Sequence, residues 1–130
     1  MRARPLSPHM SIYRMTRYCL ITSFANRITG GVLSVGLLVF VYWLTALARG
    51  ARAYARAQEV LGSDLAKLVY VAVIAAFSYH LAAGVRHLIW DTGRGLEKAQ
   101  SQRSAWLVIA VALVLAVVVL WWALRAREGA

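Results

Sequence analysis

The sequence has a single cysteine and few charged side chains, and each shortage narrows what the chain can be. Cys19 is the only cysteine among 130 residues, which excludes an internal disulfide and a metal site built from cysteines. Charged residues make up 15% of the chain, against about 25% in a typical soluble domain. Because hydrophobic residues make up 61%, the composition indicates a membrane protein of one domain.

Acidic residues are especially scarce. Five Asp and Glu stand against 15 Lys and Arg, which gives a net charge of +10. Such a basic chain could bind nucleic acid, but its basic residues flank long apolar runs. This placement favours contact with anionic membrane lipids and control of topology, so no nucleic-acid partner is expected. The N-terminal segment also lacks a short apolar core followed by a small-residue cleavage site, so no secretory signal peptide is expected.

Three uncharged runs dominate the chain, at residues 28–48, 68–85 and 105–124. Each is close to the roughly 20 residues that a helix needs to cross a bilayer. We therefore predict an all-α membrane protein with three transmembrane helices in a single membrane-anchor domain, residues 1–130. In this prediction residues 1–22 form a cytoplasmic N-terminal segment, and the spans cover about 23–48, 65–90 and 104–124.

The flanking charges predict the orientation of the spans. Nine basic residues lie in the N-terminal segment and the second connection, and six lie in the first connection and at the C-terminus. The positive-inside rule then places the N-terminus in the cytoplasm. The end of the second span therefore faces the same compartment as the start of the first, and polar residues of both converge there: Ser23, Asn26, Arg27, Arg86, His87 and Asp91.

His80 lies within the second apolar run, where an imidazole is unfavourable unless it is paired or bound. Because residues at i, i+4 and i+7 share a helix face, His80 aligns with Gly84 and His87. Gly84 would let a flat porphyrin approach the backbone, and Arg86 and His87 could pair with haem propionates at the membrane edge. The alternative is a histidine that hydrogen-bonds a neighbouring helix.

The three histidines limit how a haem could be held. His87 lies on the same helix face as His80, so the two cannot bind opposite faces of one haem. His9 lies in the polar N-terminal segment. If His80 is an axial ligand, the other ligand comes from another chain or the haem is five-coordinate.

Ser23 and Arg27 form a second candidate pair, at i and i+4 of the first span. A hydroxyl and a guanidinium at the membrane edge suit the carbonyl oxygens of a quinone. The alternative is an arginine that reaches lipid phosphates. Asp91 could cap its helix, pair with Arg86 or Arg94, or serve a proton route.

Three motifs, taken together, resemble one family. They are RPLSPHMSIYR at residues 4–14, SFANRITGG at 23–31 and YHLAAGVRHLIWDTG at 79–93. In this order they resemble the cytochrome b subunit of succinate dehydrogenase, a membrane anchor of respiratory complex II. The resemblance covers the first three-quarters of the chain, and the third span adds only hydrophobicity.

The resemblance implies a three-helix anchor that forms half of a heterodimeric haem-binding bundle. His80 matches the axial ligand of haem b, and its haem iron is the only metal expected. Ser23 and Arg27 match quinone-binding residues, with Arg27 also near a haem propionate. Asp91 matches an acidic residue near that site.

The resemblance also implies partners and a place in metabolism. A second anchor subunit would supply the other haem ligand, and the N-terminal segment would meet the iron–sulfur subunit of a complex that also holds a flavoprotein. Such a complex links the tricarboxylic acid cycle to the respiratory chain, in a bacterial inner membrane rather than a mitochondrial one. This chain has no flavin or dinucleotide fingerprint and no cluster-binding cysteines, so it does not itself oxidise succinate.

One departure and two alternatives accompany this interpretation. Asn26 stands where the family commonly has a histidine before the quinone-site arginine. Asn26 can donate a hydrogen bond but cannot titrate. The alternatives are the anchor of a fumarate reductase, which has the same architecture, and a small non-haem structural or transport protein of the membrane.

Overall fold

The computed structural model describes residues 17–128, which form four helices. They are α1 (Arg17–Ala48), α2 (Ala51–Leu61), α3 (Asp64–Asp91) and α4 (Lys98–Glu128). Three of them, α1, α3 and α4, are long and apolar enough to cross a membrane. The predicted all-α fold with three long apolar helices is therefore confirmed. The predictions for residues 1–16, including the RPLSPH segment and His9, lie outside the described residues.

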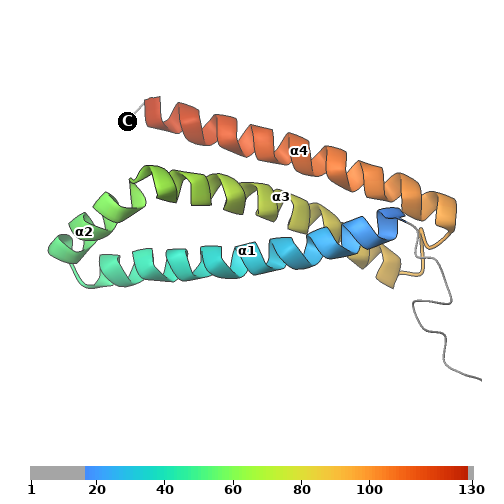
Figure 1. The fold of residues 1–130 in the computed structure, drawn as a ribbon, viewed down its shortest axis with the longest axis horizontal. Coiled ribbons are helices and arrows are strands. Elements are labelled where there is room, and N and C mark those ends of the chain that lie inside the picture. Colours follow the sequence, from blue (N-terminus) through green and yellow to red (C-terminus); the bar gives the residue numbers. More distant parts are fainter. Residues whose placement is uncertain (1–16, 129–130) are drawn as a thin grey trace, which may run out of the picture.

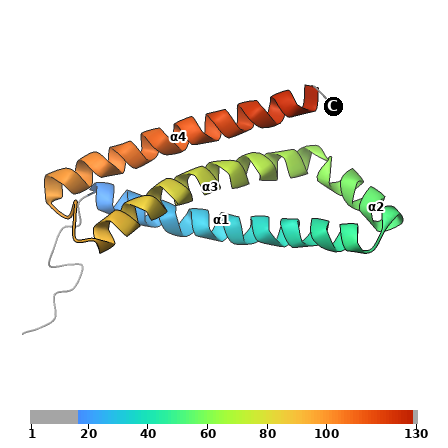
Figure 2. The same ribbon diagram turned by 180° about the vertical axis from the view of Figure 1, so that it is seen from behind.

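Helix α3 lies in the middle of the bundle, with α1 packed on one side and α4 on the other (Figures 1 and 2). Neighbouring long helices run antiparallel, and α1 and α3 cross near the end where α1 begins (Figure 1). The start of α1, the end of α3 and the start of α4 therefore meet at one end of the molecule. The short helix α2, which joins α1 to α3, lies at the other end of the molecule (Figure 1).

Small residues fill the contacts between the long helices. The buried apolar residues on α3 and α4 are alanines and one valine: Ala76, Ala82, Ala83, Ala105, Val108 and Ala112. Most leucines and most aromatic side chains of the described residues are exposed. In lipid, small residues let helix backbones approach closely, while large apolar side chains can face hydrocarbon without cost. The exposed apolar surface therefore suits lipid and partner helices.

The glycine-rich part of α1 packs closely against α3 at Gly36. A Cβ atom added at Gly36 would lie 3.0 Å from Val73 Cγ2 and 3.1 Å from Val73 Cγ1. Gly31 faces open space, and Ser34 is exposed, with its hydroxyl donating to the Gly30 carbonyl at 3.0 Å. Close contact between α1 and α3 at this depth therefore depends on Gly36.

The ends of α2 and α3 follow from local chemistry. Gly50 precedes α2 with φ of 93°, a conformation that favours glycine. Ser63 is the N-cap of α3, and its hydroxyl accepts from the Ala66 amide at 3.3 Å. Asp64 and Ser63 were the two candidates for this cap in the sequence; Asp64 lies in the first turn of the helix and pairs with Lys67 at 2.6 Å.

Candidate functional site

The end where α1 begins and α3 ends carries the polar contacts between the long helices. Tyr79 on α3 donates its hydroxyl to the Thr22 carbonyl of α1 at 3.1 Å. His80, the next residue, reaches the Thr29 hydroxyl of α1. Each contact joins a residue of α3 to a residue of α1, more than 50 positions away in the chain. Together they fix the rotation of α3 against α1.

The His80 ring lies half-buried between α3 and α1. Its Nδ1 atom is 3.2 Å from Thr29 Oγ1, and a Cβ atom added at Gly30 would lie 3.5 Å from His80 Cε1. The ring thus lies beside the Gly30 position of α1, where a Cβ atom would make an ordinary van der Waals contact with it. His80 does hydrogen-bond a neighbouring helix, as the packing alternative required, but only one ring nitrogen is used in that contact.

An apolar groove of about 410 Å³ adjoins His80. It is lined by Leu33, Phe77, His80, Leu81, Gly84, Val85 and Leu88. A Cβ atom added at Gly84 would meet nothing within 4 Å. The face of α3 that carries His80 and Gly84 is therefore open beside the imidazole, as a flat ligand on that face would require.

The predicted quinone residues lie at the same end of the molecule. Ser23 and Arg27 are on α1, and both side chains are exposed. Arg27 precedes Gly30 by three residues, about one helical turn, so it lies toward the start of α1 from the His80 ring. His87, also exposed, lies two turns beyond His80 toward the same end.

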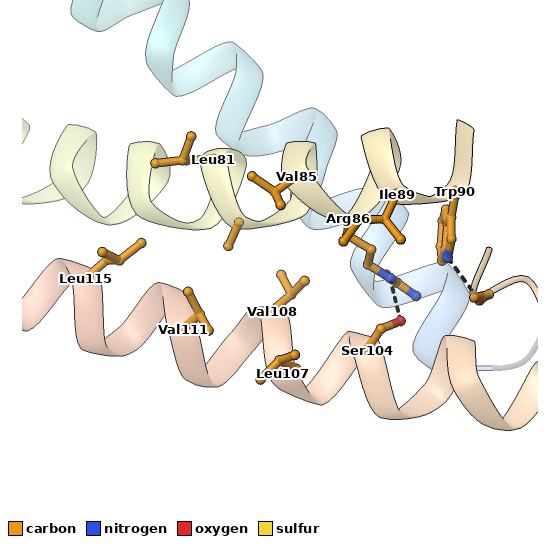
Figure 3. A pocket seen from close by; sticks show the side chains of 12 residues that line it. Leu81, Val85, Arg86, Ile89, Trp90, Ser104, Leu107, Val108, Val111 and Leu115 are labelled. Carbon is orange, nitrogen blue, oxygen red and sulfur yellow. Dashed lines mark hydrogen bonds between the residues drawn. The ribbon is translucent and has the colours of Figure 1, made fainter. Parts of the chain in front are cut away.

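Arg86 faces a different helix from His80. Its side chain is buried at 7% exposure in the contact between α3 and α4. The Nε atom donates to Ser104 Oγ at 2.9 Å, and Nη2 donates to the Ser101 carbonyl at 2.8 Å. Figure 3 shows this guanidinium reaching α4 at one end of an apolar groove of about 350 Å³. Arg86 therefore contacts α4 and does not line the groove beside His80. Its expected pairing with a haem propionate at the membrane edge stays a prediction.

Trp90 connects the two faces of α3 near its end. The Arg86 guanidinium carbon lies 4.0 Å from the Trp90 ring centroid, which is a cation–π contact. Trp90 also meets His87 in an edge-to-face contact, with ring centroids 5.2 Å apart. The indole donates to the Gly95 carbonyl at 3.1 Å, which ties the following loop back to α3 (Figure 3).

Asp91 and Asn26 occupy the remaining predicted positions. Asp91 is the last residue of α3 and is exposed. Among residues 17–128 it has no ion-pair partner within 4.0 Å, so the expected pairing with Arg86 or Arg94 is not formed there. The Asn26 side-chain oxygen is buried without a hydrogen-bond partner in the described part of the chain. A buried acceptor of this kind is costly unless something donates to it.

The geometry agrees with the comparison to known families. The succinate dehydrogenase/fumarate reductase transmembrane subunit family matches residues 1–119. The chain belongs to this family. Three long apolar helices and the motif positions now have a common explanation, and the resemblance drawn from the three motifs is confirmed.

Individual relatives agree with this membership. The chain is 42% identical to the succinate dehydrogenase cytochrome b556 subunit of Paracoccus denitrificans over 90% of its length and 89% of the relative. It is 36% identical to the b556 subunit of Rickettsia conorii, over 91% of the chain and 90% of that relative. The mitochondrial cytochrome b560 subunit of Sus scrofa is 36% identical over 82% of this chain and 63% of its own.

Sequence reasoning missed three contributors to this end of the molecule. Thr29 contacts His80, and Ser101 and Ser104 accept hydrogen bonds from Arg86. The signal was available in part, because Thr29 is a polar residue inside an apolar run and lies within the SFANRITGG motif. The partner of each polar side chain depends on helix rotation, which the hydropathy pattern does not specify.

Proposed function

We propose that this chain is the membrane-anchor cytochrome b subunit of a succinate dehydrogenase. In this role it holds one face of a haem b and forms part of the site where quinone is reduced. One observation carries the proposal: the His80 ring is hydrogen-bonded to Thr29 beside an apolar groove that Gly84 leaves open. The names of the relatives, succinate dehydrogenase cytochrome b subunits, support it.

The residues present fit a haem. His80 offers one imidazole ligand in an apolar setting, and Gly84 removes a side chain one turn away. His87 and Arg27 lie toward the polar end and would pair with propionates. When bound, haem b supplies a one-electron redox centre. Since His87 shares the face of His80, the second ligand comes from a partner anchor subunit.

The quinone would bind beside the exposed pair Ser23 and Arg27. Their hydroxyl and guanidinium would donate hydrogen bonds to the quinone carbonyls and stabilise the negative charge that develops on reduction. Electrons would come from the iron–sulfur subunit, which takes them from the flavoprotein that oxidises succinate. Asp91 is exposed at the same end, where it could pass protons. The Asn26 oxygen, which has no hydrogen-bond partner among residues 17–128, could accept a hydrogen bond from a water molecule.

The setting of the complex belongs to the same proposal. We place the chain in a bacterial inner membrane with its N-terminus in the cytoplasm. The charge asymmetry supports this orientation, and the similarity to a Paracoccus denitrificans subunit supports a bacterial membrane. The fumarate reductase alternative shares the family, which includes both kinds of anchor. The names of the relatives favour the succinate dehydrogenase direction.

A visible spectrum tests the proposal. The complex would be purified in mild detergent, its subunits identified, and its dithionite-reduced spectrum recorded. A b-type α-band is expected, and His80→Ala should abolish or shift it because an axial ligand is lost. Ser34→Ala is the control, because Ser34 is an exposed polar residue of α1 that does not line this groove, and it should keep the band. An unchanged band in His80→Ala would refute the assignment of His80 as the haem ligand. A wild-type complex without haem would favour the non-haem alternative.

A further inference from the structure

The distances around the Thr29 hydroxyl indicate which partner donates in its hydrogen bond with His80. Thr29 Oγ1 lies 2.8 Å from the Ala25 carbonyl oxygen and 3.0 Å from the Asn26 carbonyl oxygen, one turn earlier in α1. Its distance to His80 Nδ1 is longer, at 3.2 Å. A threonine hydroxyl has one hydrogen to donate, and the shorter contacts to the carbonyls take it. The hydroxyl oxygen is therefore left to accept.

The His80 tautomer follows from this direction. Because the Thr29 hydroxyl accepts, Nδ1 of the neutral imidazole carries the ring proton. The other nitrogen, Nε2, then holds an unshared electron pair. The tautomer of a ligating histidine is set by the hydrogen bond that its other ring nitrogen makes. Here the bond from Nδ1 to Thr29 of α1 leaves Nε2 unprotonated and available as a metal ligand.

The hydrogen bond to Thr29 limits the movement of the ring. Thr29 is β-branched and its hydroxyl is anchored on the preceding turn of α1, so its own rotamer is restricted. The neighbouring Gly30 position would place even a Cβ atom at an ordinary van der Waals distance, 3.5 Å, from His80 Cε1. The orientation of the imidazole therefore rests on the Thr29 hydroxyl.

We infer that Thr29 is a positioning residue for the haem ligand: it accepts the Nδ1–H bond of His80, fixes the tautomer and makes Nε2 a stronger donor to iron. The inference rests on the proposed function, in which His80 binds haem. A hydrogen bond to the distant nitrogen of a ligating histidine orients the ring and raises its basicity. A more basic ligand stabilises ferric over ferrous iron, so the bond holds the haem potential down.

The test uses the intact purified complex and a redox titration followed at the reduced α-band. Thr29→Val keeps the branched shape but removes the acceptor, and the haem midpoint potential should rise. A tenfold loss of the ferric preference corresponds to about 59 mV for one electron, and we expect a shift up to about this size. Thr29→Ser keeps a hydroxyl and should titrate like the wild type.

A matched control is available on the same helix. Ser34 also donates to the carbonyl four residues earlier, but its side chain is exposed and the described contacts of His80 do not include it. Ser34→Ala should therefore leave the potential unchanged. If Thr29→Val loses haem while Thr29→Ser retains it, the inference is also supported, since the hydroxyl then decides whether the ligand is presented.

Two results would overturn the inference. One is a Thr29→Val complex whose potential and spectrum equal those of the wild type. The other is a Thr29→Ser complex that shifts, or loses haem, as much as Thr29→Val. His80→Ala separates this failure from that of the proposed function: if His80→Ala loses the band while Thr29→Val changes nothing, only the positioning role is wrong.

Discussion

Gly84 gives the sharpest test of where a haem would lie, because the chain by itself and the proposed haem site predict opposite effects. A Cβ atom at Gly84 meets nothing within 4 Å, and the adjoining groove measures about 410 Å³. In the chain alone, Gly84→Leu should therefore strengthen α3. The gain in helix propensity on replacing an interior glycine is about 0.8–1.0 kcal/mol.

With haem in the groove, the same substitution becomes unfavourable. The leucine would occupy the space in which the porphyrin approaches the α3 backbone, and forcing extra methylenes into a filled site costs about 1–3 kcal/mol. At about 1.4 kcal/mol for each factor of ten, haem affinity should fall roughly 5- to 140-fold. The complex should thus keep its helices while it loses haem.

The assay measures the haem-to-protein ratio and the thermal unfolding of the purified complex. Gly31→Leu is the matched control, since Gly31 also faces open space but lies on an exposed part of α1. Gly31→Leu should retain haem. A Gly84→Leu complex with full haem content and an unaltered spectrum would show that no porphyrin lies over this glycine.

Two further predictions concern α1. Arg27→Ala should lower succinate–quinone turnover about 10- to 150-fold, because a hydrogen bond to a charged group contributes about 1.5–3 kcal/mol. Succinate oxidation by a soluble artificial acceptor should persist in this variant, and Arg103→Ala serves as the control at an exposed arginine. An equal loss of both activities would indicate an assembly defect instead. Gly36→Ala should lower stability to thermal unfolding by up to about 2 kcal/mol, because overpacking of about 1–3 kcal/mol outweighs a helix gain of about 1 kcal/mol. Adding Val73→Ala should relieve this loss, and purely additive effects of the two substitutions would refute the contact.

The sequence predicted the framework of the site because hydropathy and chain direction are properties of single segments. Three apolar runs of spanning length predict three long helices, and antiparallel neighbours bring the start of one beside the end of the next. His80 and Arg27 could therefore be assigned to the same end before any tertiary contact was known. The motifs then supplied the family, which hydrophobicity alone could not.

Rotation of the helices was beyond the sequence, and it decides which polar side chains meet. Arg86 and His87 are adjacent in the chain, yet Arg86 is buried against Ser101 and Ser104 while His87 is exposed. Side chains one residue apart on a helix point about 100° apart, so a small difference in rotation exchanges their partners. Apolar residues lie around more than half of the circumference of each long helix. The hydropathy pattern therefore does not show which side of the helix packs against its neighbours.

Sequence alone thus determined that this chain is a three-helix membrane protein with a histidine in its second span and a polar cluster at one membrane edge. Only the tertiary structure decided three contacts. Thr29 hydrogen-bonds His80, Gly36 packs against Val73, and Arg86 hydrogen-bonds α4. The physical reason is that burial in lipid depends on composition, which each segment carries by itself. Hydrogen bonds and close contacts depend on the mutual setting of two helices, which neither segment specifies.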